Sequence, residues 1–364
     1  MSISIIMSVF NKESFLNRSI NSVLSQSFPN FELICINAGS SDNSLKILES
    51  YVDPRIKIYS QENLGISAAK NFGVSVSKYA LIAFLDADDE WDSDYLNEIF
   101  YLYSNFPSCQ AYITGYQCNY DNYNRIVVVN SNNEKGILSD YFKYRLFGWG
   151  VHTSSMALLK SAFYEIGGFP VLISNLTNNS SFLIDCNGKI IENFSNIFLS
   201  YGSWAKDNFN RVPKQISNGY KDNILIAIRG LGSEDQYLND LLACKYQYAF
   251  SKKVLSYWYG NVPFQDTKLP KIPLHPNIIA LQKNLYKNAN SDILNYLKYL
   301  DPSLLVFNLN HSSHFIDILK VHYFFERKKI PILLKSSKYL RQFLIIINFY
   351  KRLYRKVKYL YVRV

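Results

Sequence analysis

YALIAFLDADDEW, residues 79–91, joins an apolar run to an acidic turn. The apolar run, Tyr79 to Leu85, predicts a buried strand, and Asp86 and Asp88 follow it directly. Alternate carboxylates at a strand end can share one hard cation, such as Mg²⁺ or Mn²⁺, that prefers oxygen ligands. Taken alone, the Asp-x-Asp pattern fits a solvated acidic turn or a helix cap equally well.

Three earlier apolar runs alternate with segments of helical spacing. The runs predict strands at residues 3–9, 31–36 and 55–59, with helices between them. This βαβ rhythm predicts an α/β fold with a mostly parallel sheet flanked by helices. Ligands of such sheets bind at the carboxyl ends of the strands, where the polar residues after the first, second and fourth strands fall.

Beyond residue 110 the pattern becomes irregular. Residues 171–233 are polar and contain ten Asn, which is typical of an insertion. We also expect strands at 111–117, 126–129, 152–159 and 254–259, a short helix at 232–242 and a proline-containing linker at 263–276. These features predict three regions: 1–110, 111–265 with insertion 171–233, and a basic, aromatic helical region at 266–364.

The net charge of +10 is concentrated near the C-terminus. Residues 320–364 hold thirteen Lys or Arg and one acid, Glu326, whereas the remaining residues hold 26 basic and 28 acidic side chains. A helix over residues 338–362 would carry a basic face opposite an aromatic one, which is typical of a helix on an anionic membrane surface. The alternative is a helix packed on the rest of the protein. The near-neutral remainder argues against nucleic-acid binding.

The five Cys form no C-x-x-C pair, which argues against a disulfide framework and against a zinc site. The first ten residues lack a basic start and a cleavage site, so they do not predict a signal peptide. We therefore expect a cytoplasmic protein, peripheral on the inner face of the cell membrane through its basic C-terminal region.

Five segments in a fixed order carry a family resemblance. They are residues 3–44 (ISIIMSVF through SSDNS), ENLGISAAKNFGV (62–74), YALIAFLDADDEWDSDYL (79–96), EIGGF (165–169) and SEDQYLNDLL (233–242). The chain resembles the family 2 inverting glycosyltransferases of the GT-A fold, which build bacterial surface polysaccharides. The resemblance is dense over residues 1–110, thin to about 260, and absent from the rest of the chain.

The resemblance implies a metal-dependent, inverting hexosyl- or N-acetylhexosaminyltransferase of lipopolysaccharide or capsule synthesis. It implies Mn²⁺ or Mg²⁺ as cofactor, a nucleotide-sugar donor, expected to be UDP-linked, and a glycan or lipid-linked acceptor. In such a reaction a carboxylate removes the proton of the acceptor hydroxyl while the cation stabilises the departing phosphate. An acidic turn for the cation and a distant acid for the base satisfy both needs.

The resemblance also assigns roles to individual residues. Asp86 and Asp88 match the metal-binding motif, and Asp235, with its neighbour Glu234, matches the acid pair that supplies the general base. The implied donor-binding residues are Val9, Asn11, Glu13, Asn37, Asp42, Lys70, Asp86, Ala87 and Asp88.

The acceptor side has four candidate residues. Gly168 and Phe169 match a family segment beside the acceptor. Trp258 is a candidate because aromatic faces stack on sugar rings, although core packing is the commoner fate of a tryptophan. His152 lies in an apolar strand pattern, so a structural histidine and an acceptor-side or phosphate-binding histidine are both open.

One departure from the family pattern supplies an alternative function. The second turn usually reads Asp-Gly-Ser, and this chain has Ala38-Gly39-Ser40 preceded by Asn37. Because alanine cannot hydrogen-bond a base, the alternative is a non-catalytic relative or one with an altered donor. A nucleotidyltransferase also uses paired Asp on an α/β sheet, but residues 8–12 lack its glycine-rich phosphate loop.

Overall fold

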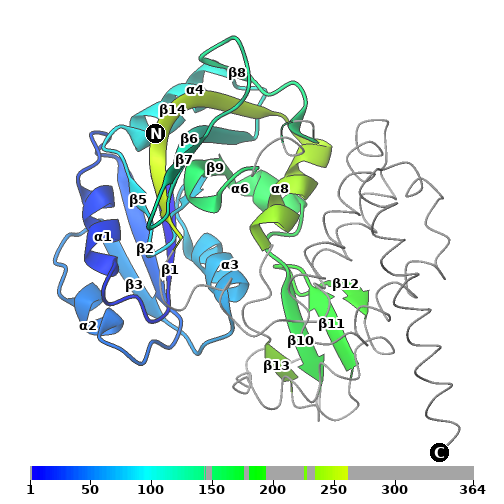
Figure 1. Cartoon of the computed structure of the whole chain (residues 1–364). Helices are drawn as coiled ribbons and strands as arrows, with labels where there is room; N and C mark the ends of the chain where they lie inside the picture. The colour runs from blue at the N-terminus through cyan, green and yellow to red at the C-terminus, as the bar shows by residue number, and fades with distance from the viewer. Residues whose placement is uncertain are drawn as a thin grey trace, which may run out of the picture. The chain divides into compact units, whose positions relative to one another are not determined.

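The computed structural model describes residues 2–142, 144, 150–175, 180–193, 225–227 and 234–260 (Figure 1). All of them belong to one of two units into which the chain divides, Met1–Pro270 with His275–Ile293. The predicted helical region at 266–364, including its basic helix, lies outside the described residues. Among the described helices, none is long and apolar enough to cross a membrane.

Helices and strands alternate through the first hundred residues, as the sequence predicts. The described helices are α1 (Leu16–Leu24), α2 (Ser44–Glu49), α3 (Ile66–Val76), α4 (Tyr95–Asn105), η1 (Thr153–Ser155), α6 (Lys160–Glu165) and α8 (Glu234–Lys245). The described strands are β1 (Ile3–Val9), β2 (Phe31–Asn37), β3 (Ile56–Ser60), β4 (Leu81–Phe84), β5 (Glu90–Trp91), β6 (Ala111–Asn119), β7 (Asn124–Val127), β8 (Lys135–Ile137), β9 (Met156–Leu159), β10 (Val171–Asn175), β11 (Ser180–Ile184), β12 (Ile190–Asn193), β13 (Leu225–Ala227) and β14 (Tyr248–Tyr259).

The central sheet has the strand order β3-β2-β1-β4-β9-β6-β14-β5, with β7 beside β6 and β8 beside β14. The first four strands of this order are parallel to one another, and β14 is parallel to β6. β9 is antiparallel to both of its neighbours, β4 and β6. The predicted α/β class is confirmed, with one antiparallel strand joining the two parallel parts.

Helices cover both faces of the sheet, because its strands are apolar on both sides. On one face, alternate residues of β1 such as Ile5 and Met7 pack with Ile20 of α1, Leu48 of α2 and Ile99 of α4. The opposite face of β2 packs against α3. The contact there is close, since a Cβ added to Gly73 would lie 2.5 Å from Cγ2 of Ile6.

Strand direction brings distant segments to one edge of the sheet. Ala83 of β4 is paired with Ala157 of the antiparallel β9, so the turn that precedes β9 lies beside the residues that follow β4. β14 runs parallel to β6, and its Ser256 is paired with Trp91 just after the acidic turn. The carboxyl ends of β1, β2, β4 and β14 therefore meet there, together with the start of β9 (Figure 1).

The prediction of one strand over residues 152–159 is wrong at its start. His152 lies outside the strand and precedes the single turn η1, whose Ser154 donates its backbone N–H to Nδ1 of His152 at 3.3 Å. The reason is local. The His152 ring and the Ser155 hydroxyl form hydrogen bonds with backbone groups of this turn, and in a strand those backbone groups would bond to a neighbouring strand. Ser155 Oγ likewise donates to the His152 carbonyl at 2.8 Å.

The expected irregular insertion at 171–233 contains strands. β10, β11, β12 and β13 form a separate antiparallel sheet in the order β12-β11-β10-β13. Asn residues end β10 and β12 and lie between the strands, for example Asn187. Asparagine favours turns, so a count over the whole segment hides the short apolar strands between them. Residues 176–179, 194–224 and 228–233 lie outside the described part.

Glu32 of β2 is a buried carboxylate that joins three segments of the fold. It accepts hydrogen bonds from Ser4 Oγ, Lys57 Nζ and the backbone N–H of Lys78, each at 2.6 Å. Burial alone would raise the pKa of Glu32, but the hydrogen bonds from Lys57, Ser4 and Lys78 together lower it below its ordinary value. The folded state therefore favours the ionised carboxylate.

We predict that Glu32→Gln destabilises the protein in a pH-dependent way. A lowered folded-state pKa contributes stability above the unfolded pKa, about 4.3, and this contribution is lost as pH falls through the folded value. Urea unfolding should show a loss of about 1.5 to 3 kcal/mol at pH 7 that shrinks below about pH 4. The exposed Glu49→Gln is the control. A loss that is the same at all pH values would contradict this assignment.

Candidate functional site

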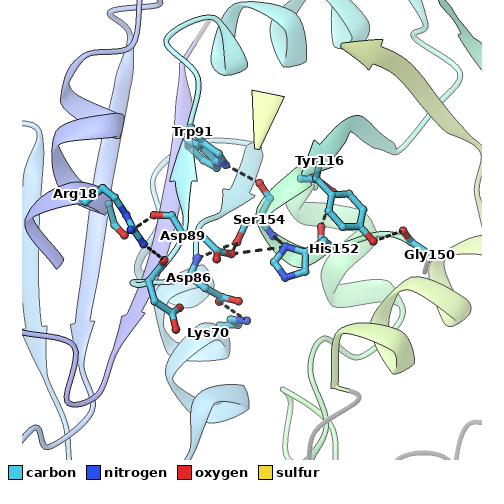
Figure 2. Close-up of polar contacts among 12 residues, drawn as sticks. Arg18, Lys70, Asp86, Asp89, Trp91, Tyr116, Gly150, His152 and Ser154 are labelled. Carbon is cyan, nitrogen blue, oxygen red and sulfur yellow. Dashed lines mark hydrogen bonds and ion pairs between the residues drawn. The ribbon is translucent and has the colours of Figure 1, made fainter. Parts of the chain in front are cut away.

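The acidic turn after β4 is anchored by one hydroxyl group. The backbone N–H of Asp86 donates to Ser154 Oγ at 3.1 Å, and Ser154 Oγ donates to Oδ2 of Asp89 at 2.5 Å. The turn is closed by the N–H of Asp89, which donates to the Asp86 carbonyl at 2.9 Å. Figure 2 shows Ser154 between these two acids. Ser154 of η1 therefore holds the backbone of Asp86 and the carboxylate of Asp89.

Two lysines are paired with the two acids of the Asp-x-Asp motif. Lys70 of α3, 1% exposed, lies 2.9 Å from Oδ1 of Asp86 (Figure 2). Lys12, which follows β1, donates to Oδ2 of Asp88 at 2.8 Å. Each lysine approaches from a different element, so the motif lies between the end of β1 and the helix α3. The carboxylate of Asp88 is largely buried, as is the Lys12 side chain.

The charge of Lys70 is supported by acids from two distant parts of the chain. Burial alone would lower the pKa of Lys70. The negative charge of Asp86, and to a smaller extent the charges of Glu234 and Asp235, raise this pKa above its ordinary value. The same ion pair has the opposite effect on the pKa of Asp86. Burial would raise the pKa of Asp86, and Lys70 is the main group that lowers it. Lys70 is thus a charged ammonium and Asp86 a carboxylate.

At Asp89 and His152, burial shifts the pKa toward the neutral form. Burial raises the pKa of Asp89 well above its usual range, and the charges of Asp88 and Asp86 add to this effect. Burial likewise lowers the pKa of His152, although Asp86 and Asp235 oppose the shift. Nδ1 of His152 lies 3.7 Å from Oδ2 of Asp89. Burial therefore acts against charge at Asp89 and at His152, whereas Lys70 favours the ionised form of Asp86.

The residues present fit a divalent cation. Asp86, Asp89 and His152 each offer one ligand atom, and these atoms lie within 4.8 Å of one another. Oδ1 of Asp89 is buried and has no hydrogen-bond partner in the described structure. Carboxylate oxygen and imidazole nitrogen both bind Mn²⁺-type ions. The predicted ligand Asp88 is not part of this cluster, and its direct binding to a metal stays a prediction.

The predicted acid pair Glu234 and Asp235 begins helix α8. Glu234 is buried and Asp235 is half-buried. Both act on Lys70, and Asp235 also acts on His152. The structure therefore brings the acids of residues 86 and 235 into one electrostatic neighbourhood, as the two-part arrangement in the sequence predicts.

The predicted donor-side residues connect the loops after β1 and β2. Asn11, with a φ of +52°, accepts the Ser41 N–H at 2.8 Å, and Asp42 accepts the Glu13 N–H at 3.1 Å. Glu13 in turn accepts the Asn43 N–H at 2.9 Å. These hydrogen bonds hold the loops after β1 and β2 together. Contact between these residues and a donor remains a prediction.

The innermost donor-side positions are buried. Val9, Asn37, Ala38 and Ala87 are each at most 4% exposed. The Ala38 N–H donates to the Val9 carbonyl at 2.8 Å, and Oδ1 of Asn37 accepts the Ser40 N–H at 3.1 Å. The amide oxygen of Asn37 therefore stabilises the turn at residues 37–40.

The acceptor-side candidates fall into two groups. Phe169 is fully buried against Phe84, and its ring faces the Lys70 ammonium at 5.5 Å. Gly168 has a φ of +62° and leaves no room for a Cβ. Trp258, by contrast, is half-buried and lies near the ring of His152, with centroids 6.2 Å apart.

Three side chains that contact the acidic turn were not predicted from the sequence. Lys12 and Ser154 contact the acidic turn directly, and Arg18 donates to the Asp88 carbonyl at 2.5 Å. The Arg18 guanidinium also lies over the Tyr259 ring, 3.7 Å from its centroid. The one available signal was the position of Lys12 just after the first strand.

Comparisons with known proteins agree with this geometry. Residues 4–167 match the family described as "Glycosyl transferase family 2". The chain is 35% identical over 99 residues to "Putative glycosyltransferase EpsH" of Bacillus subtilis (strain 168), covering 27% of this chain and 29% of that protein. It is 37% identical over 115 residues to "UDP-Glc:alpha-D-GlcNAc-diphosphoundecaprenol beta-1,3-glucosyltransferase WfgD" of Escherichia coli, covering 29% of this chain and 45% of that protein. The chain thus spans less than half the length of either relative.

A solved structure is similar over more of the chain. The S. aureus TarS 1–349 structure in complex with UDP-GlcNAc aligns with 82% of this chain and 70% of that chain, at 13% identity and a TM-score of 0.56. At this identity the likeness shows the fold. The predicted GT-A fold is confirmed.

We predict that Lys70→Met destabilises the protein by about 3 kcal/mol, because Asp86 loses the ammonium that compensates its burial. The double variant Lys70→Met/Asp86→Asn should recover part of this loss, since the uncompensated charge is removed. Urea unfolding of the full chain measures both values. Lys46→Met, on the exposed side of α2, is the control and should change stability by about 0.5 kcal/mol or less. Additive losses in the double variant would contradict a pairing of Lys70 with Asp86.

Proposed function

We propose that this chain, whose residues 4–167 belong to glycosyl transferase family 2, transfers a sugar from a nucleotide-sugar donor to a hydroxyl group of a glycan or lipid-linked acceptor. One observation carries the proposal. The buried Lys70 lies 2.9 Å from Oδ1 of Asp86 in the acidic turn, and Glu234 and Asp235 of α8 act with Asp86 to raise the pKa of Lys70. A cation-binding turn and a separate carboxylate at one site are what in-line transfer of a sugar requires.

We assign the role of general base to Asp235, with Glu234 beside it. The Asp235 carboxylate takes the proton of the acceptor hydroxyl as its oxygen attacks the anomeric carbon. The bond from that carbon to the donor phosphate oxygen breaks with its electron pair, and the nucleoside diphosphate leaves. Attack opposite the leaving group inverts the anomeric configuration. Asp235 lies in the first turn of α8, within electrostatic range of both Lys70 and His152.

The turn at residues 86–89 would hold Mn²⁺ or Mg²⁺ beside the donor diphosphate. Asp86 supports this proposal, because it belongs both to the Asp-x-Asp motif and to the cluster of Asp86, Asp89 and His152. When bound, the ion supplies positive charge that stabilises the departing phosphate. Lys12 and Lys70 bring further positive charge to the same turn. Their ammonium groups are positioned to balance the carboxylates before a donor binds and to attract its phosphates.

Names of related proteins support the substrate class. The E. coli relative is named for a UDP-linked sugar donor and a diphosphoundecaprenol acceptor, and the TarS structure is titled as a UDP-GlcNAc complex. We therefore propose a UDP-linked hexose or N-acetylhexosamine donor. The pathway would be that of a bacterial surface polysaccharide, such as lipopolysaccharide or capsule. The basic residues at 338–362 would hold the enzyme at an anionic membrane surface, where lipid-linked acceptors are found.

The alternative function is a relative that binds an altered donor or does not turn it over. Ala38 supports it, because the side chain is buried and offers no hydrogen bond where the family pattern has an acid. The amide of the neighbouring Asn37 is engaged by Ser40 and, at 3.5 Å, by Ser60. A base other than uracil is the simplest consequence. Donor binding without turnover in the wild type would favour this alternative.

We predict that Asp235→Asn lowers turnover by about 10² to 10⁴-fold, which is the usual contribution of a general base. Donor binding should be unchanged, because the base acts on the acceptor hydroxyl. The measurements are UDP release from a panel of UDP-sugars, with Mn²⁺ and a bacterial lipid extract, and UDP affinity by calorimetry. Asp94→Asn, at the exposed start of α4, is the matched control. Undiminished turnover would place the base elsewhere.

A further inference from the structure

We propose that the ends of β6, β7 and β14 bind a carbohydrate chain carried by the acceptor, and that Trp258 and Tyr123 stack on its sugar rings. The inference rests on the proposed function, which requires a glycan or lipid-linked acceptor. It goes beyond that function by committing to an acceptor that already carries sugars. It also gives a role to Tyr120 and Tyr123, which the sequence did not single out. We call Trp258, Tyr120 and Tyr123 the aromatic row.

The first argument is that the aromatic row is continuous with the candidate site. The rings of His152 and Trp258 have centroids 6.2 Å apart, and those of Trp258 and Tyr120 lie 5.4 Å apart. Tyr123 stacks on Tyr120 with centroids 4.6 Å apart. These spacings are usual for neighbouring aromatic rings. Because His152 also faces Asp89 of the acidic turn, the row leads from that turn to the loop between β6 and β7.

The second argument is that the row lies on one face of the sheet. Cys118 of β6 is paired with Arg125 of β7 on one side and with Trp258 of β14 on the other, so these three side chains share a face. The buried part of this face, which includes Tyr116 and Cys118, packs against Tyr120 and Trp258. The rings of the row are therefore anchored on a buried cluster.

The third argument is that neighbouring backbone holds the rings in place. The backbone N–H of Tyr120 donates to the Tyr123 carbonyl at 3.0 Å, and the N–H of Gly260 donates to the Asn119 carbonyl at 2.9 Å. A Cβ added to Gly260 would lie 2.9 Å from the Tyr120 ring and 3.1 Å from Trp258. Tyr120 is therefore tightly packed and supports the rings on either side. Rings that are fixed before a ligand binds lose little conformational freedom on binding.

The fourth argument is the exposure of the outer rings. Tyr123 is 58% exposed, although one of its faces stacks on Tyr120. Its other face is therefore open to solvent, and Trp258 is half-buried. An aromatic face carries partial negative charge, which attracts the C–H groups of a sugar ring. Covering such a face also removes apolar surface from water.

The surroundings of the row favour a carbohydrate over a lipid or a protein. Arg125, which is exposed on the same face, has N–H donors that suit sugar hydroxyl groups. Ile126, the exposed aliphatic residue of β7, is paired with Gln117 and lies on the opposite face. A lipid or protein partner would favour a continuous apolar patch. Aromatic rings with a polar neighbour instead fit a ligand that has both C–H faces and hydroxyl groups.

The strand order indicates which substrate lies on the row. In the central sheet, β4 and β9 separate β6 and β14 from β1 and β2. The predicted donor-binding residues lie largely after β1 and β2, so the row approaches the acidic turn from the other side. Asp235, the proposed base, acts on His152 at the inner end of the row. A carbohydrate chain on the row would therefore bring its terminal sugar toward that base.

The first test is saturation-transfer difference NMR of the full chain with oligosaccharides that mild acid releases from bacterial lipid-linked oligosaccharides. We expect saturation transfer to sugar C–H protons with the wild type. Affinity should fall by about 2- to 12-fold in Tyr123→Ala, as for the loss of one aromatic contact. Tyr123→Phe keeps the ring and should bind like the wild type. Tyr101→Ala, which removes an exposed tyrosine of α4, is the matched control and should leave binding unchanged.

The second test is UDP release with the intact lipid-linked oligosaccharides as acceptor. Tyr123→Ala should raise the acceptor KM by a similar factor and leave kcat and UDP affinity unchanged, because the row contacts the acceptor away from the reacting atoms. Trp258→Ala should weaken acceptor binding in the same way. Circular dichroism shows whether this half-buried position still folds, and the exposed Tyr123 keeps the test decisive if it does not.

The outcomes distinguish this inference from the proposed function. Oligosaccharides that do not bind the wild type, or that bind Tyr123→Ala as tightly as the wild type, overturn the inference and leave the proposed function standing. Undecaprenyl phosphate, a lipid without sugars, overturns it too if Tyr123→Ala weakens binding of this lipid and not of the oligosaccharides. A wild-type chain that binds the oligosaccharides but releases no UDP from any UDP-sugar contradicts the proposed function instead.

Discussion

The buried ion pair between Lys70 and Asp86 is the interaction on which the site depends. A lysine that is 1% exposed stays charged only if acids compensate its burial, and those acids come from the end of β4 and the start of α8. The ammonium therefore holds together carboxylates that would otherwise repel one another. Without it, the turn after β4 and the acid pair of α8 would lack a common counter-charge.

The sequence predicted those elements whose pattern is local. β1 begins and ends where its apolar run does, at Ile3 and Val9, and the helices that follow show the expected spacing. β5 and β8 are two and three residues long, and pairing with β14 rather than composition makes them strands. The small sheet at 171–227 was missed because a polar average concealed short apolar strands.

For the site, positions could be predicted from the sequence but partners could not. Asp86, Lys70 and Asp235 come together because motifs at strand and helix ends converge on one edge of an α/β sheet. The contacts of Lys12 with Asp88 and of Ser154 with Asp89 span 76 and 65 residues, and no local pattern encodes them. His152 lies in an apolar strand pattern in the sequence. In the structure it precedes the short turn η1, and this turn places it at the site instead of in β9.

A crystal structure of the full chain with UDP and Mn²⁺ tests most directly whether the turn at 86–89 and the acid pair of α8 form one transfer site. The account predicts a diphosphate against the turn, near Lys70, with the Asp235 carboxylate facing the space beyond the terminal phosphate where a sugar would lie. A diphosphate bound away from Asp86, or an Asp235 carboxylate turned away from that space, would contradict the account.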